Sequence, residues 1–120
     1  MNPLRINRLK RNLWKRDLVH VPDDVWNETE LEVLILADNG LTTISDRIGA
    51  LKKLRTLDLG HNRLASLPEA LGELPELADF LYLHDNQLTQ LPSSLSQLQK
   101  LRYLNISGNS FTALPEVSLP

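Results

Sequence analysis

One eleven-residue pattern occurs four times in this 120-residue chain and constrains its fold more than any other feature. The pattern reads L-x-x-L-x-L-x-x-N-x-L, and its copies begin at residues 31, 54, 78 and 101. Its asparagines, Asn39, Asn62, Asn86 and Asn109, follow one another at intervals of 23, 24 and 23 residues. A fixed period of this length is typical of stacked repeats, so we expect a solenoid rather than a closed globule.

Leucine makes up 27 of the 120 residues, which indicates that one packing environment is used many times. The chain has no cysteine, and this excludes disulfide-stapled scaffolds and zinc sites built from thiolates. No stretch approaches the roughly 18 apolar residues that span a membrane, and the N-terminus lacks the apolar run of a signal peptide. We therefore expect a cytoplasmic protein.

Each repeat divides into a strand-like half and a returning half. The alternation in L-x-x-L-x-L predicts a short strand with one buried face, and stacking such strands in parallel requires a return connection. Apolar residues spaced by three and four in the second half predict a short helical segment with one buried side. The recurrent asparagine is expected to have a structural role, because a buried amide at the bend can both donate to and accept from the backbone.

These motifs resemble the leucine-rich repeat family, in its class of about 23 residues that ends in L-P-x-x-I/L-G-x-L-x-x-L. Leu67-Pro68, Leu71-Gly72 and Leu74 carry this ending in the second repeat. The class is common in bacterial proteins and in intracellular scaffold proteins. The resemblance implies an α/β solenoid with a short parallel sheet on its concave face and helical or 3-10 return segments on its convex face. It also implies a protein partner, no cofactor and no catalysis.

The period divides the chain into five units. Residues 1–30 are expected to form a basic N-terminal cap with a degenerate first repeat, followed by repeats at 31–53, 54–77, 78–100 and a truncated 101–120. In the first unit, Arg8, Arg11 and Arg16 occupy two leucine places and the asparagine place. Terminal repeats need a polar outer face, so we interpret this segment as a cap with Trp26 packed beneath it.

Two irregularities give further expectations. The third repeat contains one extra residue, and Leu77 and Ala78 compete for one buried place, so we expect a bulge or a shifted return near Leu74–Asp79. The fourth return segment is missing after Leu114-Pro115. We therefore expect either a fragment of a longer repeat protein or an end that a partner or a second copy covers, as in a homodimer.

The non-leucine places of the strands are expected to face a partner. Counted from the first leucine of each unit, these are the third, fifth, seventh and eighth places. Four of the six aromatic residues fall there, and aromatic side chains are frequent anchors of protein interfaces. We expect Phe80, Tyr82 and Tyr103 to form the centre of the patch. The complete candidate set is Trp14, Ile35, Asp58, His61, Phe80, Tyr82, His84, Asp85, Tyr103 and Asn105. The alternative is that aromatic residues simply suit an exposed strand.

Asp38, His61 and Asp85 share the eighth place of successive units, with His84 adjacent. Carboxylates and imidazoles in a row can ligate a divalent metal. The exposed loops offer no residue that would orient such ligands, so we expect no metal site.

The functional expectation is a protein-interaction module, because no nucleophile elbow, P-loop, dinucleotide-binding turn or H-E-x-x-H motif occurs. One alternative is the sensor or substrate-recognition part of a larger bacterial effector or kinase. A second alternative follows from charge, since residues 1–16 carry +6 and the remainder −8, which sum to the net charge of −2. A basic segment of this kind can bind nucleic acid or an anionic membrane surface, although a protein partner is the expectation we prefer.

Overall fold

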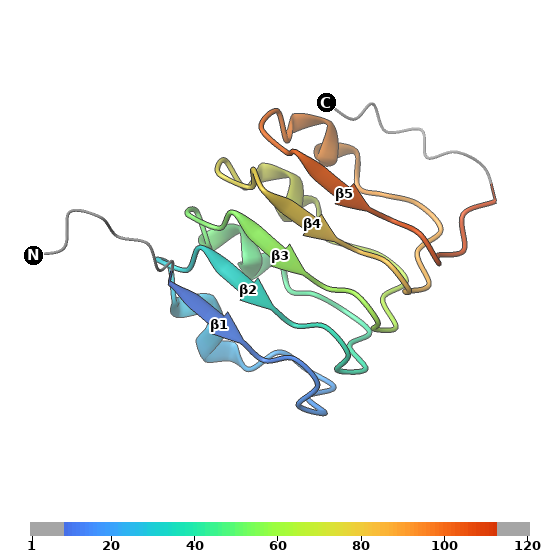
Figure 1. The fold of residues 1–120 in the computed structure, drawn as a ribbon, viewed down its shortest axis with the longest axis horizontal. Coiled ribbons are helices and arrows are strands. Elements are labelled where there is room, and N and C mark those ends of the chain that lie inside the picture. The colour runs from blue at the N-terminus through green and yellow to red at the C-terminus, as the bar shows by residue number, and fades with distance from the viewer. Residues whose placement is uncertain (1–8, 113–120) are drawn as a thin grey trace, which may run out of the picture.

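The computed structural model describes residues 9–112, which form five consecutive units that each begin with a three-residue strand (Figure 1). The strands are β1 (Lys10–Asn12), β2 (Val33–Ile35), β3 (Thr56–Asp58), β4 (Phe80–Tyr82) and β5 (Tyr103–Asn105). They form one parallel sheet in the order β1-β2-β3-β4-β5, so each strand lies beside its neighbour in the sequence. The solenoid and its parallel sheet are therefore confirmed.

The register of the sheet aligns equivalent places of neighbouring repeats. Leu34 pairs with Leu57 and Leu57 pairs with Leu81, all at the fourth place of their repeats. Arg11 pairs with Leu34, which confirms the alignment of the degenerate first unit with the second. A residue of one unit can therefore be placed beside its equivalent in the next directly from the repeat count.

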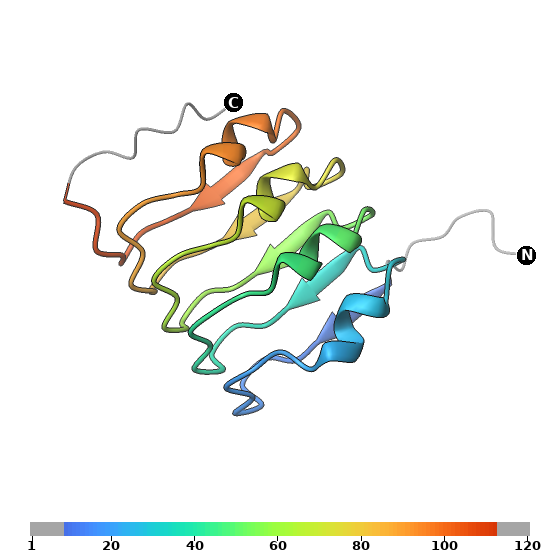
Figure 2. The ribbon, with the colours of Figure 1, turned by 180° about the vertical axis from the view of Figure 1, so that it is seen from behind.

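The return segments lie behind the sheet as short 3-10 helices (Figure 2). They are η1 (Asp23–Asn27), η2 (Asp46–Ala50), η3 (Glu69–Glu73) and η4 (Ser93–Gln97). Proline precedes three of them in extended or polyproline-like backbone, which suits a residue whose φ is fixed and whose nitrogen cannot donate. No helix among the described residues is long and apolar enough to cross a membrane.

The hydrophobic core fills the space between the sheet and the 3-10 helices. The central leucines of β2, β3 and β4 have no exposed surface, and the leucines two residues later (Leu36, Leu59 and Leu83) are equally buried. From the helical layer, Ile48, Leu71 and Leu95 complete the same core. The excess of leucine thus arises because one set of buried positions recurs in every unit.

At the first unit, a charged side chain lies where the later repeats have a core leucine. Arg11 occupies a leucine place, is half-buried and forms ion pairs with Glu28 and, at 3.9 Å, with Asp24. Trp26 is buried in the core, as expected. The backbone N–H of Arg16, at the asparagine place, donates to the side chain of Asn39. The interpretation of this unit as a cap stays a prediction, and Arg8 lies outside the described residues.

The extra residue of the third repeat is accommodated just before β4. Leu74, at the end of η3, has a ψ of 111°, whereas its equivalents Leu51 and Leu98 have values of 65° and 71°. Leu77 and Ala78 are both buried, and Phe80 resumes the register opposite Thr56. The irregularity therefore falls within the predicted stretch and leaves the strand pairing intact.

Apolar side chains of the last described unit are less covered than their equivalents. Leu101, Leu104 and Ile106 are only half-buried, whereas the residues at these places in the three preceding repeats are buried. The expected end of the pattern at Leu114-Pro115 lies outside the described residues.

Candidate protein-binding surface on the outward face of the sheet

The outward face of the sheet, which we call the sheet face, lies opposite the 3-10 helices. The register brings the third-place residues Lys10, Val33, Thr56, Phe80 and Tyr103 into one row. A second row contains the fifth-place residues Asn12, Ile35, Asp58, Tyr82 and Asn105. The expected alternation of core-facing and outward residues is confirmed, because the fourth place between these rows is buried in β2, β3 and β4.

Phe80, Tyr82 and Tyr103 lie in mutual ring contact and form what we call the aromatic cluster. Phe80 stacks nearly parallel to Tyr82 with ring centroids 5.8 Å apart, and the Tyr82–Tyr103 centroids are 5.6 Å apart. Phe80 and Tyr103 pack edge to face at 5.9 Å. Phe80 nevertheless remains 43% exposed and Tyr103 45% exposed. The cluster is thus an apolar surface on the outside of the molecule.

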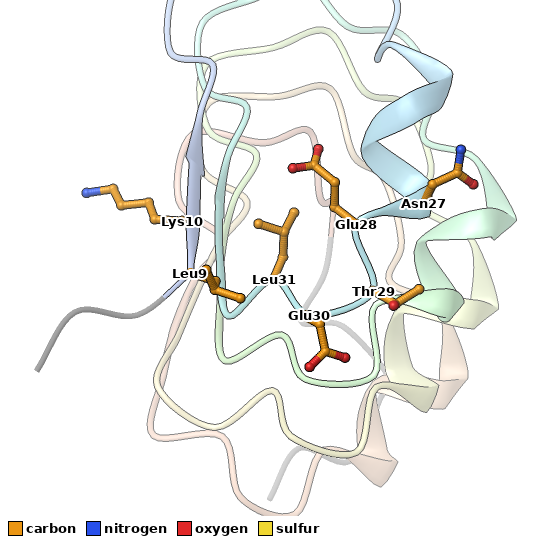
Figure 3. Close-up of a pocket in the computed structure, with 7 residues that line it drawn as sticks. All are labelled: Leu9, Lys10, Asn27, Glu28, Thr29, Glu30 and Leu31. Carbon is orange, nitrogen blue, oxygen red and sulfur yellow. The ribbon is translucent and has the colours of Figure 1, made fainter. Parts of the chain in front are cut away.

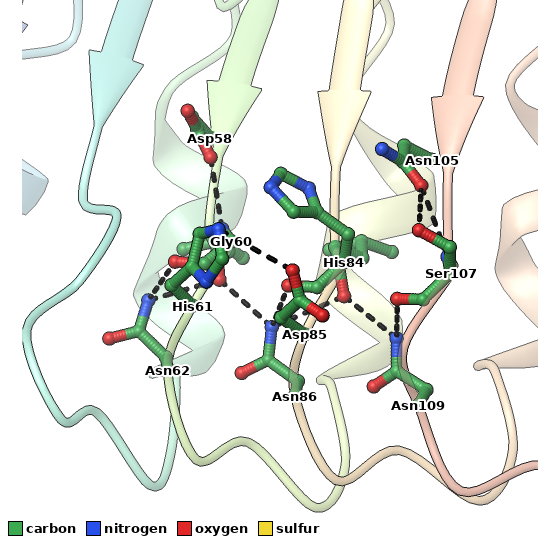
Figure 4. A network of polar contacts seen from close by, with 12 residues as sticks. Asp58, Gly60, His61, Asn62, His84, Asp85, Asn86, Asn105, Ser107 and Asn109 are labelled. Atoms are coloured by element: carbon green, nitrogen blue, oxygen red, sulfur yellow. Dashed lines mark hydrogen bonds and ion pairs between the residues drawn. The ribbon is translucent and has the colours of Figure 1, made fainter.

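The ring contacts continue from the cluster toward the ends of the strands. Tyr82 packs edge to face with His84 at 5.9 Å, and His84 packs edge to face with His61 at 5.0 Å. His61 Nε2 lies 3.4 Å from Asp85 Oδ2 (Figure 4). Six of the predicted surface residues therefore form one continuous strip that grades from apolar rings to ionisable groups.

Two other predicted residues lie beside this strip and form hydrogen bonds with the backbone. Asp58 Oδ1 accepts a hydrogen bond from the backbone N–H of Gly60 at 2.9 Å, and Asn105 Oδ1 accepts from that of Ser107 at 3.1 Å. Asn12 makes the same contact with Trp14 in the first unit. A short polar side chain at the fifth place thus stabilises the bend that follows the strand.

Trp14 and Ile35 are not part of the strip. Ile35 is half-buried on β2, next to Asp58 in the register. Trp14 belongs to the first unit, three strands from β4, which corresponds to roughly 14 Å at the usual strand spacing. Trp14 is 54% exposed, and its ring lies beside the ammonium group of Lys15. The predicted set therefore comprises a contiguous strip and two residues apart from it.

The eighth-place residues Asp38, His61, Asp85 and Gly108 are exposed, as expected, whereas the seventh place differs from the expectation in two repeats. Ala37 and Gly60 were expected to face outward at the seventh place, but both are buried. Gly60 is covered because the ring of His84 lies against it, leaving no room for a Cβ. The eighth-place residues share the left-handed backbone region, with φ between 52° and 68° at Lys15, Asp38, His61, Asp85 and Gly108. Asp, His and Gly tolerate this region better than most residues, so the bend itself favours them there.

Two hollows lie apart from the strip of aromatic and ionisable residues. One, of about 260 Å³, is at the end of the first unit and is lined by Leu9, Lys10, Leu31 and residues 27–30 (Figure 3). The other, of about 290 Å³, is on the helical side between η3 and η4 and includes Glu69 and Ser93. Here hydrogen bonds from the backbone N–H and the side chain of Ser94 hold the pKa of the Glu69 carboxyl below its ordinary value. Neither hollow contains a residue of the predicted candidate set.

Comparison with known proteins places these features in a family. The model of the family described as "Leucine rich repeat" matches residues 29–88, and that of "Leucine Rich repeats (2 copies)" matches residues 79–116. A leucine-rich repeat and calponin homology domain-containing protein of Drosophila melanogaster is 46% identical over 48 residues, which cover 39% of this chain and 6% of the fly protein.

Solved structures show the same architecture. A leucine-rich repeat protein of Leptospira interrogans superimposes with a TM-score of 0.77 at 29% identity, covering 87% of this chain and 32% of that one. The ectodomain of the plant receptor kinase GASSHO1/SCHENGEN3 from Arabidopsis thaliana, solved with CASPARIAN STRIP INTEGRITY FACTOR 2, superimposes with a TM-score of 0.72 at 32% identity. The match covers 86% of this chain and 13% of that ectodomain. This chain thus spans less than a third of the length of these proteins. Its repeats, sheet and family matches together show that it belongs to the leucine-rich repeat family.

Proposed function

We propose that this chain is a protein-interaction module that binds a partner polypeptide through the aromatic cluster on its sheet face. Leucine-rich repeat domains generally mediate protein–protein interaction and are typically non-enzymatic scaffolds. The observation that carries the proposal is the mutual contact of three rings, with centroids 5.6 to 5.9 Å apart, on an exposed surface. Clustered exposed aromatic side chains are characteristic of interaction sites, whereas single ones are ordinary.

The surroundings of the cluster have the arrangement that protein interfaces use. His84, Asp58 and Asn105 border the rings with polar groups, so an apolar centre is surrounded by a polar rim. The rings are already packed against one another, so little side-chain freedom would be lost on binding. The cluster therefore suits a partner that inserts one or two apolar side chains and bonds to the rim.

A peptide selection tests this proposal. A displayed random peptide library is selected on the immobilised chain, and the affinity of a winning synthetic peptide is measured by calorimetry. Tyr82→Ala and Tyr103→Ala are each expected to weaken binding at least about tenfold, as loss of a central aromatic anchor does. Trp14→Ala is the matched control, because Trp14 is exposed but lies apart from the cluster. It should change the affinity less than about threefold.

Thermal unfolding followed by circular dichroism checks that each variant remains folded. An affinity that survives Tyr82→Ala and Tyr103→Ala in folded protein contradicts the proposal. A selection that returns no peptide of micromolar affinity contradicts it as well.

A second proposal concerns the larger context of the module. The matches cover 6% of the fly relative and 13% of the plant ectodomain, so equivalent units occur there within longer proteins. We propose as an alternative that this chain is the recognition part of a larger effector or kinase. An antibody against the chain should then detect a native product well above 13.6 kDa. A native product of that size alone would rule this alternative out.

A further inference from the structure

Three potential metal ligands meet at the ends of β3 and β4, next to the aromatic cluster but separate from it (Figure 4). His61, His84 and Asp85 each offer one ligand atom, and these atoms all lie within 4.8 Å of one another. Asp38, which shares the eighth place with His61 and Asp85, is not part of this group. The cluster thus differs from the row that the sequence suggested, because His84 reaches across to His61 in the neighbouring unit.

The spacing of one pair of these atoms agrees with tetrahedral coordination. Ligand atoms on one zinc ion lie about 3.3 Å apart, given bond lengths of about 2.0–2.2 Å and tetrahedral angles. His61 Nε2 and Asp85 Oδ2 are already 3.4 Å apart. His84 completes the triad within 4.8 Å, and His61 is exposed enough to adjust its rotamer toward a common ion. A side-chain rearrangement that shortens the remaining separations, which are at most 4.8 Å, to about 3.3 Å would bring all three atoms to one centre.

The backbone holds the three ligands in place. His61 N–H donates to the carbonyl of His84 at 2.9 Å, and Asp85 N–H donates to the carbonyl of Ser107 at 2.9 Å. The ring of His84 lies against Gly60, where a Cβ would come within 2.5 Å of it. The ligands therefore project from hydrogen-bonded ends of adjacent strands, which fixes the relative positions of their backbones.

One ring nitrogen of His84 has an unmet hydrogen-bonding capacity. Its Nδ1 is inaccessible to solvent and has no hydrogen-bond partner among the described residues. Buried polar side-chain atoms usually have a partner, so an unpaired imidazole nitrogen is an exception that calls for an explanation. The His84 ring packs against Gly60, Tyr82 and His61, which sets its orientation. A bound ion would give this imidazole a polar interaction.

We propose that His61, His84 and Asp85 form a three-ligand site for a divalent transition-metal ion, best suited to zinc. Two imidazoles with one carboxylate are ligands of intermediate softness, which favour zinc, cobalt, nickel or copper over magnesium and calcium. Three protein ligands leave a fourth position for water or a group from a partner. The site lies at the surface, with 60% of the His61 side chain exposed, so the ion can enter from solvent.

Titration of the metal-free chain with Zn²⁺ in a calorimeter tests the site, and Co²⁺ supplies a visible absorption spectrum that reports tetrahedral geometry. We expect one ion per chain, a Kd in the micromolar range and no comparable heat with Mg²⁺. His61→Asn and Asp85→Asn remove a preferred ligand, while asparagine tolerates the positive φ at both positions. Each should weaken zinc binding roughly tenfold or more.

His20→Gln is the matched control, because His20 is the third histidine of the chain and is exposed outside the cluster. Its affinity for Zn²⁺ should remain that of the unmodified chain. The proposal is overturned if Zn²⁺ produces no saturable heat up to millimolar concentration. It is also overturned if folded His61→Asn and Asp85→Asn bind as tightly as the unmodified chain, or if His20→Gln lowers the affinity equally. None of these results depends on whether the aromatic cluster binds a partner.

Discussion

The backbone N–H of Asn39 donates a hydrogen bond to the side-chain Oδ1 of Asn62 in the next repeat, with 3.0 Å between the two atoms. Asn62 Oδ1 also accepts from Leu41 N–H, and its Nδ2 donates to the carbonyls of Leu36 and Leu59. Asn86 and Asn109 bond their own neighbours in the same manner. The asparagines thus form a ladder that satisfies the buried bends where backbone groups have left the sheet.

Replacing Asn62 by alanine should therefore be strongly destabilising. The substitution leaves buried N–H and C=O groups of two repeats without partners, and each such group costs about 1–3 kcal/mol. We expect the free energy of unfolding to fall by about 3 kcal/mol or more in urea denaturation. Asn27→Ala is the control, because its side chain is exposed and should matter by less than about 1 kcal/mol. Equal losses in the two variants would contradict the ladder's structural importance.

The two glycines in η2 and η3 occupy the same place but have different surroundings. A Cβ on Gly72 would lie 2.2 Å from the backbone of Ser94, whereas a Cβ on Gly49 would only reach ordinary contact with Ala70 at 3.4 Å. Gly72→Ala should lower the free energy of unfolding by about 1–3 kcal/mol, because a backbone must move to accept the methyl group. Gly49→Ala should remain within about 1 kcal/mol of the unmodified chain. Thermal or urea unfolding of both variants makes the comparison, and similar stabilities would refute it.

Two ion pairs connect neighbouring repeats at very different depths. Arg55 Nη2 donates to the nearly buried Asp79 Oδ1 at 3.2 Å, whereas Lys53 and Glu30 pair in solvent. Asp79→Ala should cost about 2 kcal/mol, because it leaves a half-buried guanidinium without this partner. Glu30→Ala should cost less than about 1 kcal/mol, as is usual for exposed pairs. If Glu30→Ala lowered the free energy of unfolding more than Asp79→Ala in urea denaturation, burial would not determine how much these ion pairs contribute to stability.

The hydrogen-bonded carboxylate of Glu69 should make the stability of the chain depend on pH in the acidic range. Its pKa is lowered by hydrogen bonds from Ser94 and Ser93, so the folded chain favours the carboxylate form. The resulting stabilisation is fully present above the ordinary pKa of glutamate, about 4.3, and disappears as the pH falls through the lowered folded value. Glu69→Gln should therefore reduce the melting temperature at pH 7 but not at pH 2.

Glu73→Gln, a charge-matched change in the same helix, controls for net charge in that experiment. A Glu69→Gln deficit that persists unchanged at pH 2 would show that the carboxylate is not responsible.

Much of the fold could be predicted because each structural position recurs in every repeat of the sequence. The strands, their register and the buried leucines follow from the period, and the structure confirms them from Leu34 to Leu81. The aromatic cluster followed as well, because equal places in adjacent units must be neighbours in a parallel stack. The burial of Ala37 and Gly60 was missed, since the period gives a position along the strand but not what covers it.

The repeat was thus enough to identify the family, the order of the strands and the rows of residues on the sheet face, because these depend only on counting positions within a period. Which side chains meet between rows became visible only in three dimensions. His84 turns across Gly60 toward His61 and Asp85, and Asp79 pairs with Arg55 after the extra residue of the third repeat. Such contacts depend on rotamers, local backbone angles and the space left by neighbours, which a one-dimensional pattern does not encode.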